Sequence, residues 1–171
     1  SLGLVGSEMC IRDRLKPLEG EIDLIGTPIS KLTMSEMDRF RGKNIGIVFQ
    51  KPHFINSLTV KENLQLAQYI SKKIDKTRIS SLLESLGIED KANKKTLNLS
   101  QGEKQRVAIA LAIVNSPKLI LADEPTSSLD DLNCNKVINL LKNQAAKYKA
   151  KLIIITHDYR LKKHFKNTLS L

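Results

Sequence analysis

The second half of the chain alternates short apolar runs with helical repeats. The runs at 119–122 and 152–156 have the length of buried strands. A helix that ends before Pro117 precedes the first run, and a short helix from Asp158 and a last strand near Leu169 follow the second. The helix between the two runs has one apolar face, formed by Val137, Leu141, Ala145 and Tyr148. Strands that alternate with helices predict a parallel sheet flanked by helices.

The first half predicts shorter elements. Residues 20–26 alternate polar and apolar side chains before a turn, and 45–49 form a second strand-like run. Thr59 begins a segment with the spacing of a helix capping box, and another helix ends at about Leu86. No strand-like run separates these two helices, so they predict a small helical subdomain at about 57–98.

Composition limits the class of protein. With 171 residues and 41% hydrophobic content, the chain is expected to form one domain with its own core. No apolar run approaches the roughly 20 residues that a membrane-spanning helix needs. The two cysteines, Cys10 and Cys134, suggest no disulfide framework and fit a reducing cytosol. Aromatic residues are only 4% and tryptophan is absent, which argues against stacking on nucleic-acid bases.

The formal net charge of +10 has two interpretations. Basic side chains are dense near the C-terminus, at Lys142, Lys147, Lys149, Lys151, Arg160, Lys162, Lys163 and Lys166. One interpretation is a surface for anionic lipids or nucleic acid. The other, which we favour, is a solvated lysine-rich exterior. We therefore expect no nucleic-acid partner.

A capping box predicts a sharply defined helix start at Ser100. Ser100 and Glu103 have the required spacing. The free N–H groups of such a helix end favour an anion such as a phosphate, and Gly102 has no Cβ to obstruct its approach. An ordinary well-capped core helix has the same spacing, so these residues alone leave both interpretations open.

Two neighbouring carboxylates, Asp123 and Glu124, directly follow the apolar run at 119–122. In open parallel sheets, ligands bind beyond the carboxyl ends of the strands. One carboxylate there can hold a magnesium ion while its neighbour acts on a water molecule. The pair therefore predicts a site for metal and water chemistry at this end of the strand.

In this order and spacing, the two segments resemble the ATPase subunit of ATP-binding-cassette (ABC) transporters. Residues 100–110 resemble the family's signature motif, although Gln101 stands where the family most often has glycine. The resemblance implies an α/β fold, with a P-loop NTPase-like parallel sheet flanked by helices. It also implies a small helical subdomain and a remnant of an antiparallel β subdomain.

The resemblance implies a role for each candidate residue. Asp123 would hold Mg²⁺, and Glu124 would be the general base for the attacking water. Gln50 would reach the magnesium ion or the water, His157 would contact the γ-phosphate, and Asp130 would contact the opposite subunit. The ATP held by the opposite subunit would be bound by Ser100, Gln101, Gly102 and Glu103.

ATP and Mg²⁺ are the cofactors that the resemblance implies. The implied partners are a second ABC ATPase subunit, arranged head to tail, and transmembrane permease subunits that are driven through the region after Gln50. The expected location is cytoplasmic, peripheral on the inner face of the plasma membrane. Residues 57–63 look most similar to the lipoprotein-releasing and macrolide-exporting branch, and cell-division ABC ATPases are the alternative.

Two other hypotheses compete with a transporter subunit. A DNA-repair or chromosome-maintenance ABC ATPase would suit the basic charge. Such proteins insert a long coiled coil between these motifs, whereas about 50 residues without sustained heptads separate Gln50 from Ser100. The third hypothesis is a non-catalytic piece that only docks.

The family's phosphate-binding loop, G-x-x-x-x-G-K-[ST], has no match in this sequence. The only Gly-Lys pair is Gly42 and Lys43, with Met37 where the first glycine belongs and Asn44 in place of Ser or Thr. We therefore expect the chain to be truncated at its N-terminus and inactive in ATP hydrolysis.

Residues 1–14 stand where that loop would be expected. They resemble the translated adapter sequence found at the ends of fragmentary gene predictions, and such segments are set aside before fold reasoning. We expect 1–14 to be non-native and 15–171 to be a partial ABC ATPase domain. The alternative is a short native strand at 2–5 followed by a loop.

Overall fold

The computed structural model describes residues 21–72, 74–127 and 129–168. The segment at 1–14 that we expect to be non-native and the predicted last strand near Leu169 lie outside these residues. Within the described ranges, no helix has both the length and the apolar character needed to cross a membrane.

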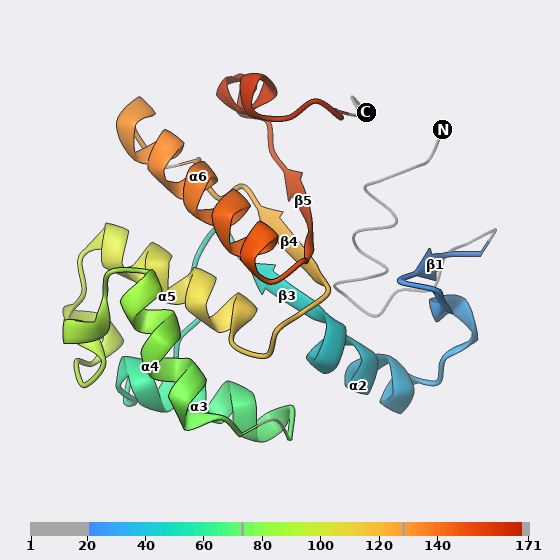
Figure 1. The fold of residues 1–171 in the computed structure, drawn as a ribbon, viewed down its shortest axis with the longest axis horizontal. Helices are drawn as coiled ribbons and strands as arrows, with labels where there is room; N and C mark the ends of the chain where they lie inside the picture. Colours follow the sequence, from blue (N-terminus) through green and yellow to red (C-terminus); the bar gives the residue numbers. More distant parts are fainter. Residues whose placement is uncertain (1–20, 73, 128, 169–171) are drawn as a thin grey trace.

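Three parallel strands form the central sheet, as the apolar runs predicted (Figure 1). They are β3 (Ile45–Val48), β4 (Leu119–Asp123) and β5 (Lys151–Ile155), in the order β3-β4-β5. The register pairs Val48 with Ala122 and Asp123 with Ile155, so the strands end at the same edge of the sheet. β4 is the middle strand and is buried on both faces, which explains its uninterrupted apolar sequence.

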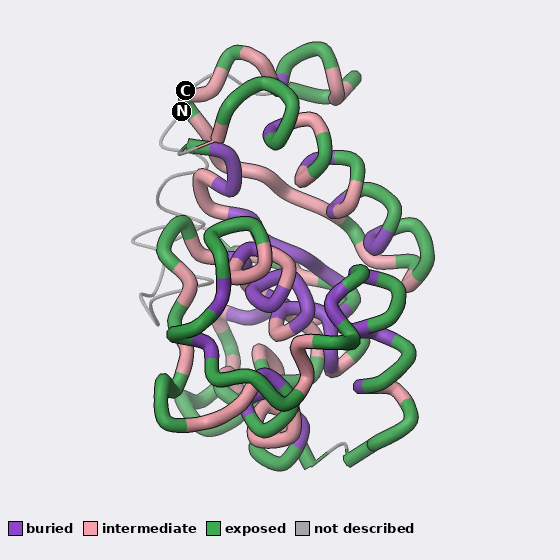
Figure 2. Tube along the Cα trace, turned by 90° about the vertical axis from the view of Figure 1, so that its left-hand side faces the viewer, coloured by how far each residue is buried: buried purple, intermediate pink, exposed green. Residues whose placement is uncertain are grey.

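Helices lie on both faces of the sheet. They are α2 (Met34–Asn44), α3 (Val60–Ile70), α4 (Lys76–Ser85), α5 (Gln101–Ile113) and α6 (Asp131–Lys147). On one face, Ile120 and Ala122 share the main core with residues of α5 and α6. On the other face, Leu119 and Leu121 pack with residues that include Phe40 of α2. Figure 2 shows the buried positions gathered in the interior between these layers. The predicted sheet flanked by helices is confirmed.

The predicted helix starts are confirmed by their capping contacts. Thr59 and Ser100 are the N-caps of α3 and α5, and each forms a complete capping box with the glutamate three residues later. α4 ends at Ser85, and Gly87 just beyond it has a φ of 63°. A glycine in this left-handed conformation commonly terminates a helix.

α3 and α4 pack against α5. Leu64, Leu82 and Ile113 belong to one buried cluster. Arg78 of α4 donates from Nε to the carbonyl of Val114 at 2.6 Å and from Nη2 to the carbonyl of Ile113 at 2.8 Å. These bonds satisfy carbonyls that the end of α5 leaves without helical partners. The limits of a helical subdomain at about 57–98 stay a prediction.

The N-terminal part differs from the sequence prediction. β1 (Asp23–Leu24) and β2 (Thr27–Pro28) form a short antiparallel hairpin, so the strand expected at 20–26 turns back at Ile25 and Gly26. Both turn residues have positive φ, 58° and 74°, as a two-residue hairpin turn of this type requires.

α2 was not predicted from the sequence. None of its residues is fully buried, so its apolar positions do not form a clear stripe. Gly42 and Lys43 lie in its last turn. This Gly-Lys pair is therefore helical and is not a phosphate-binding loop, as the sequence indicated.

Candidate functional site

Four of the predicted site residues lie where the strands of the sheet end. Gln50 follows β3 by two residues, Asp123 ends β4 with Glu124 directly after it, and His157 follows β5 by two residues. Because the strands are parallel and in register, these residues meet at one edge of the sheet. Ligands bind at this edge in open parallel sheets.

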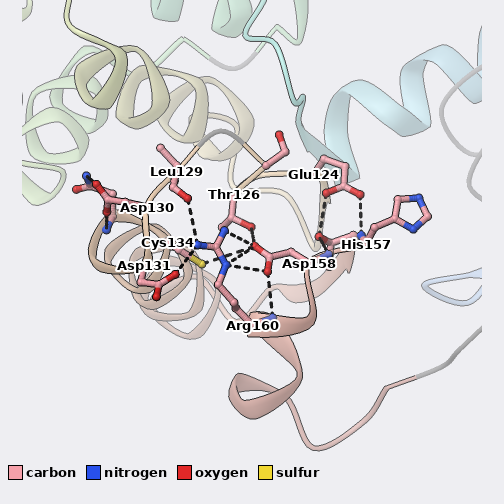
Figure 3. Close-up of polar contacts among 12 residues, drawn as sticks. Glu124, Thr126, Leu129, Asp130, Asp131, Cys134, His157, Asp158 and Arg160 are labelled. Carbon is pink, nitrogen blue, oxygen red and sulfur yellow. Dashed lines mark hydrogen bonds and ion pairs between the residues drawn. The ribbon is translucent and has the colours of Figure 1, made fainter.

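Glu124 is fixed to the end of β5 by its backbone and its side chain. Its N–H donates to the carbonyl of Ile155 at 2.9 Å. Its carboxylate accepts from Thr156 Oγ1 at 2.9 Å and from the backbone N–H of His157 at 2.7 Å (Figure 3). An ionised carboxylate has lone pairs for about four donors, so these two bonds leave room for a further donor such as water.

Gln50 contacts the loop that follows β4. Its Nε2 donates to Ser127 Oγ at 3.1 Å, and the N–H of Ser127 donates to the carbonyl of Glu124 at 3.3 Å. The exposed amide of Gln50 is therefore linked to the segment that carries Glu124. Asp123 is partly buried at the last position of β4.

His157 is exposed, and its backbone N–H and its imidazole ring point in different directions. Its backbone N–H binds the Glu124 carboxylate, while its imidazole ring extends away from that carboxylate (Figure 3). The ring is thus accessible at the edge of the sheet where the strands end.

The N-terminus of α5 is exposed at Ser100, Gln101 and Gly102. The N–H of Ser100 donates to Glu103 Oε2 at 2.7 Å, and the N–H of Glu103 donates to Ser100 Oγ at 3.3 Å. Hydrogen bonding from Ser100 lowers the pKa of Glu103, and the ionised carboxylate also pairs with Lys91 at 3.3 Å. The N–H groups of the first helical turn have no partner within the helix, so this end favours an anion.

Asp130 is the N-cap of α6. Its carboxylate accepts from the backbone N–H of Asn133 at 2.8 Å and from Asn133 Nδ2 at 2.9 Å, and these bonds lower the pKa of Asp130. A cleft of ≈ 280 Å³ between α5 and α6 is lined by Asp130 together with Gln101 and Gly102. The predicted contact between Asp130 and a partner subunit stays a prediction.

The α5 segment is joined to the strand edge through Gln105. This buried side chain donates from Nε2 to the carbonyl of Pro125 at 3.3 Å. Pro125 directly follows Glu124 in the sequence. A shift of α5 would therefore act on the loop after β4 through this hydrogen bond.

The oxygen donors at the strand edge fit Mg²⁺. Among the described residues, no group of three or more His, Cys, Asp or Glu side chains could hold a metal ion unaided. Mg²⁺ is usually held by one or two carboxylates together with substrate phosphates and water. Asp123, together with the amide oxygen of Gln50 just beyond the neighbouring strand β3, supplies donors of this kind.

Sequence comparison decides the family. The sequence model of the ABC transporter family matches residues 8–127. The chain belongs to the ABC transporter family. The lipoprotein-releasing system ATP-binding protein LolD of Wigglesworthia glossinidia brevipalpis is 35% identical over 158 residues, which make up 91% of this chain and 69% of the relative.

Solved structures of ABC cassettes share the fold. The dimeric bacterial ABC transporter cassette MJ0796 gives a TM-score of 0.77 at 32% identity, over 92% of this chain and 72% of that one. Its dimeric post-hydrolysis state, bound to ADP and Pi, gives 0.75 at 32% identity, over 90% and 70%. Clostridium perfringens cbiO1, part of the ABC transporter complex cbiONQ, gives 0.78 at 31% identity, over 89% and 61%. The chain is therefore an ABC transporter ATPase subunit with a P-loop NTPase-like fold.

Three polar residues next to this ABC site, Thr126, Asp158 and Arg160, had no predicted chemical role. Thr126 is completely buried, and its Oγ1 donates to Asp158 Oδ2 at 2.9 Å. Hydrogen bonds from Arg160, and then from Thr126, lower the pKa of Asp158 to about 2. Thr126 lies two residues after Glu124, and Asp158 directly follows His157. These positions in the sequence could have marked both residues as neighbours of the site. Arg160 had no comparable signal.

Proposed function

We propose that this ABC subunit, when it also carries a phosphate-binding loop, hydrolyses MgATP at the edge of the sheet where β3, β4 and β5 end. The observation that carries the proposal is the convergence of Gln50, Glu124 and His157 on one edge, through Ser127 and the Glu124 carboxylate. Asp123 and Gln50 would hold Mg²⁺ there. When bound, the ion would neutralise charge on the phosphate oxygens.

Glu124 is proposed as the general base. Its carboxylate can orient a water molecule with the lone pairs that Thr156 and His157 leave free, and it can accept a proton from that water. The His157 ring, accessible at the same edge, is proposed to contact the γ-phosphate. Both residues are held by the end of β5, which favours a fixed relative geometry.

The exposed N-terminus of α5 is proposed to bind the ATP of a second subunit. Its oriented N–H groups and the absence of a Cβ at Gly102 suit a phosphate. Gln101 and Glu103 belong to the same proposed contact, and Asp130, across the cleft from Gln101, is proposed to touch the opposite subunit. The dimeric cassettes among the structural relatives support pairing with a second subunit, and the head-to-tail arrangement is part of the proposal.

We infer that the partners are a second ABC ATPase subunit and transmembrane permease subunits. The similarity to the LolD lipoprotein-releasing protein favours lipoprotein release or a related export, with a cytoplasmic position on the inner face of the plasma membrane. The similarity to cbiO1, part of a transporter complex, supports a permease partner in general.

We propose that the 171-residue chain by itself does not hydrolyse ATP. The phosphate-binding loop motif has no match in its sequence, so the charge-assisted hydrogen bonds that the loop supplies to phosphates are lacking. Isothermal titration calorimetry with MgATP is expected to show no micromolar binding. Micromolar binding by this chain would contradict the proposal.

The proposed contact of α5 with the ATP of a second subunit is tested in a variant of this subunit. This variant has a segment with the G-x-x-x-x-G-K-[ST] motif joined to it. Ser100→Arg places a large cation on the helix end and is expected to abolish turnover while the monomer's affinity for ATP is unchanged. Ser81→Arg, on an exposed position of α4, is the matched control and should retain turnover. Full turnover in Ser100→Arg would refute a role for α5 in the partner's ATP site.

A further inference from the structure

A partly buried polar cluster joins the loop after β4 to the loop after β5. Asp158 is at its centre, and its carboxylate accepts from Arg160 Nη2 at 2.7 Å and from Arg160 Nε at 2.9 Å (Figure 3). The same carboxylate accepts from Thr126 Oγ1 at 2.9 Å. Thr126 lies 32 residues before Asp158, so this bond fastens two separate segments together.

Arg160 extends the cluster to the start of α6. Its Nη1 donates to the carbonyl of Leu129 at 3.1 Å and to Asp131 Oδ1 at 2.7 Å. A guanidinium presents its donors in a rigid planar fork, so Arg160 fixes Asp158, Leu129 and Asp131 relative to one another. Leu129 and Asp131 flank Asp130 on either side.

A chain of hydrogen bonds leads from Asp158 to Glu124. The backbone N–H of Asp158 donates to Thr156 Oγ1 at 3.0 Å, and Thr156 Oγ1 donates to Glu124 Oε2 at 2.9 Å. The hydroxyl of Thr156 is thereby oriented, because its oxygen accepts from one side while its proton points to Glu124. The N–H of His157 binds the other oxygen of Glu124.

We propose that Asp158 and Arg160 are positioning residues that hold Glu124, His157 and Asp130 in one arrangement for ATP hydrolysis. This proposal rests on the proposed function. Asp158 does cap the short helix η4 (Tyr159–His164), but a cap alone would not require its contacts with Thr126 or the reach of Arg160 to Leu129. These contacts cross between the segments that carry the three residues.

The test compares the 171-residue chain with its Arg160→Ala variant by two-dimensional ¹H–¹⁵N NMR. The two reporters are the His157 amide, which donates to Glu124, and the Leu129 amide, which donates to the Thr126 carbonyl. An amide that loses a carboxylate acceptor shifts upfield, so we expect the His157 proton to move upfield. We expect both amides to exchange with solvent about tenfold faster or more, because both loops open together.

Lys163→Ala is the matched control, since it removes an equal charge from an exposed position of η4. Both reporter amides should keep their wild-type shifts and exchange rates in it. Arg160→Lys keeps the positive charge but lacks the planar guanidinium. It should change the shifts and exchange rates of both reporter amides in the same direction as Arg160→Ala, by a smaller amount. If Arg160→Ala does not fold, Arg160→Lys decides the question.

The proposal is overturned if only the amides of η4 respond in the folded variant, or if Lys163→Ala gives the same response. The measurement needs no nucleotide. A negative result would therefore leave the proposed ATPase site standing, and a failure of the ATPase proposal would leave the coupling of the two loops measurable.

Discussion

At the scale of single residues, Glu124 combines an uncommon backbone with a well-bonded side chain. Its φ of 45° is rare for a residue with a Cβ and costs on the order of 1 kcal/mol or more, so the surroundings must maintain it. The bond from its N–H to Ile155 and the two bonds to its carboxylate do so. Such conformations cluster at functional sites, which agrees with the role proposed for this residue.

Glu124→Gln separates nucleotide binding from hydrolysis. In a form that carries a phosphate-binding loop, we expect ATP binding to be retained while turnover falls by roughly two to four orders of magnitude, because an amide cannot accept the proton of the attacking water. Steady-state phosphate release and equilibrium ATP binding measure the two effects. Unchanged turnover would show that Glu124 is not the base, and Glu89→Gln, on an exposed site, is the control.

Asp158→Asn should alter the pH dependence of stability. The folded pKa of Asp158 is about 2 against an ordinary 3.8, so the ionised carboxylate stabilises the fold above about pH 4 and loses this contribution as the pH falls towards 2. The difference in unfolding free energy between wild type and Asp158→Asn should therefore shrink over this window. Urea unfolding at a series of pH values measures it.

The control for this pH effect is the same substitution in an Arg160→Ala background. Arg160 is the largest cause of the lowered pKa of Asp158, so the pH dependence of the difference should be smaller there. An identical pH dependence in both backgrounds would contradict the assignment.

At the scale of elements, β3 and α5 approach each other closely at one glycine. A Cβ placed on Gly46 would lie 2.0 Å from the carbonyl oxygen of Ala112. The atom in its way belongs to the backbone of α5, which cannot yield without moving the helix. This contact sets the distance between the strand that precedes Gln50 and the helix that begins after Ser100.

Gly46→Ala is therefore expected to destabilise the protein by about 3 kcal/mol or more, or to prevent folding, through overpacking. Gly42→Ala, where a Cβ would meet nothing within 4 Å, is the matched control. It lies in α2 and should stabilise the protein by up to about 1 kcal/mol, because alanine is the better helix former. Thermal unfolding followed by circular dichroism compares the two, and a Gly46→Ala protein of wild-type stability would refute the packing argument.

At the scale of the whole molecule, the charge of +10 is the property that best separates the competing ABC hypotheses. Non-specific attraction of a basic protein to DNA falls steeply with salt. For a transporter subunit, we expect no binding of a 30-base-pair duplex in the low micromolar range at about 150 mM salt. Fluorescence anisotropy measures this, with a low-salt titration as the positive control. Micromolar affinity at about 150 mM salt would favour the chromosome-maintenance alternative.

Much of the fold followed from local sequence pattern. The strands β4 and β5 and the capped starts of α3 and α5 were predicted because each depends on neighbours a few residues away. α2 was missed because it has no fully buried residue and hence no clear apolar stripe. At 20–26 a strand leading into a turn was predicted, but the return strand β2 (Thr27–Pro28) was not, because two residues are too few to show an alternating pattern.

By itself, the sequence determined the alternation of strands and helices from Ser100 onward, and it indicated which acids, amides and glycines belong to an ABC ATPase. Only the tertiary structure decided how the loops after β4 and β5 are fastened together. The contacts of Asp158 with Thr126 and of Arg160 with Leu129 join residues about thirty positions apart. No periodicity or spacing rule encodes such contacts, because they exist only after the parallel strands have brought both loops to the same edge of the sheet.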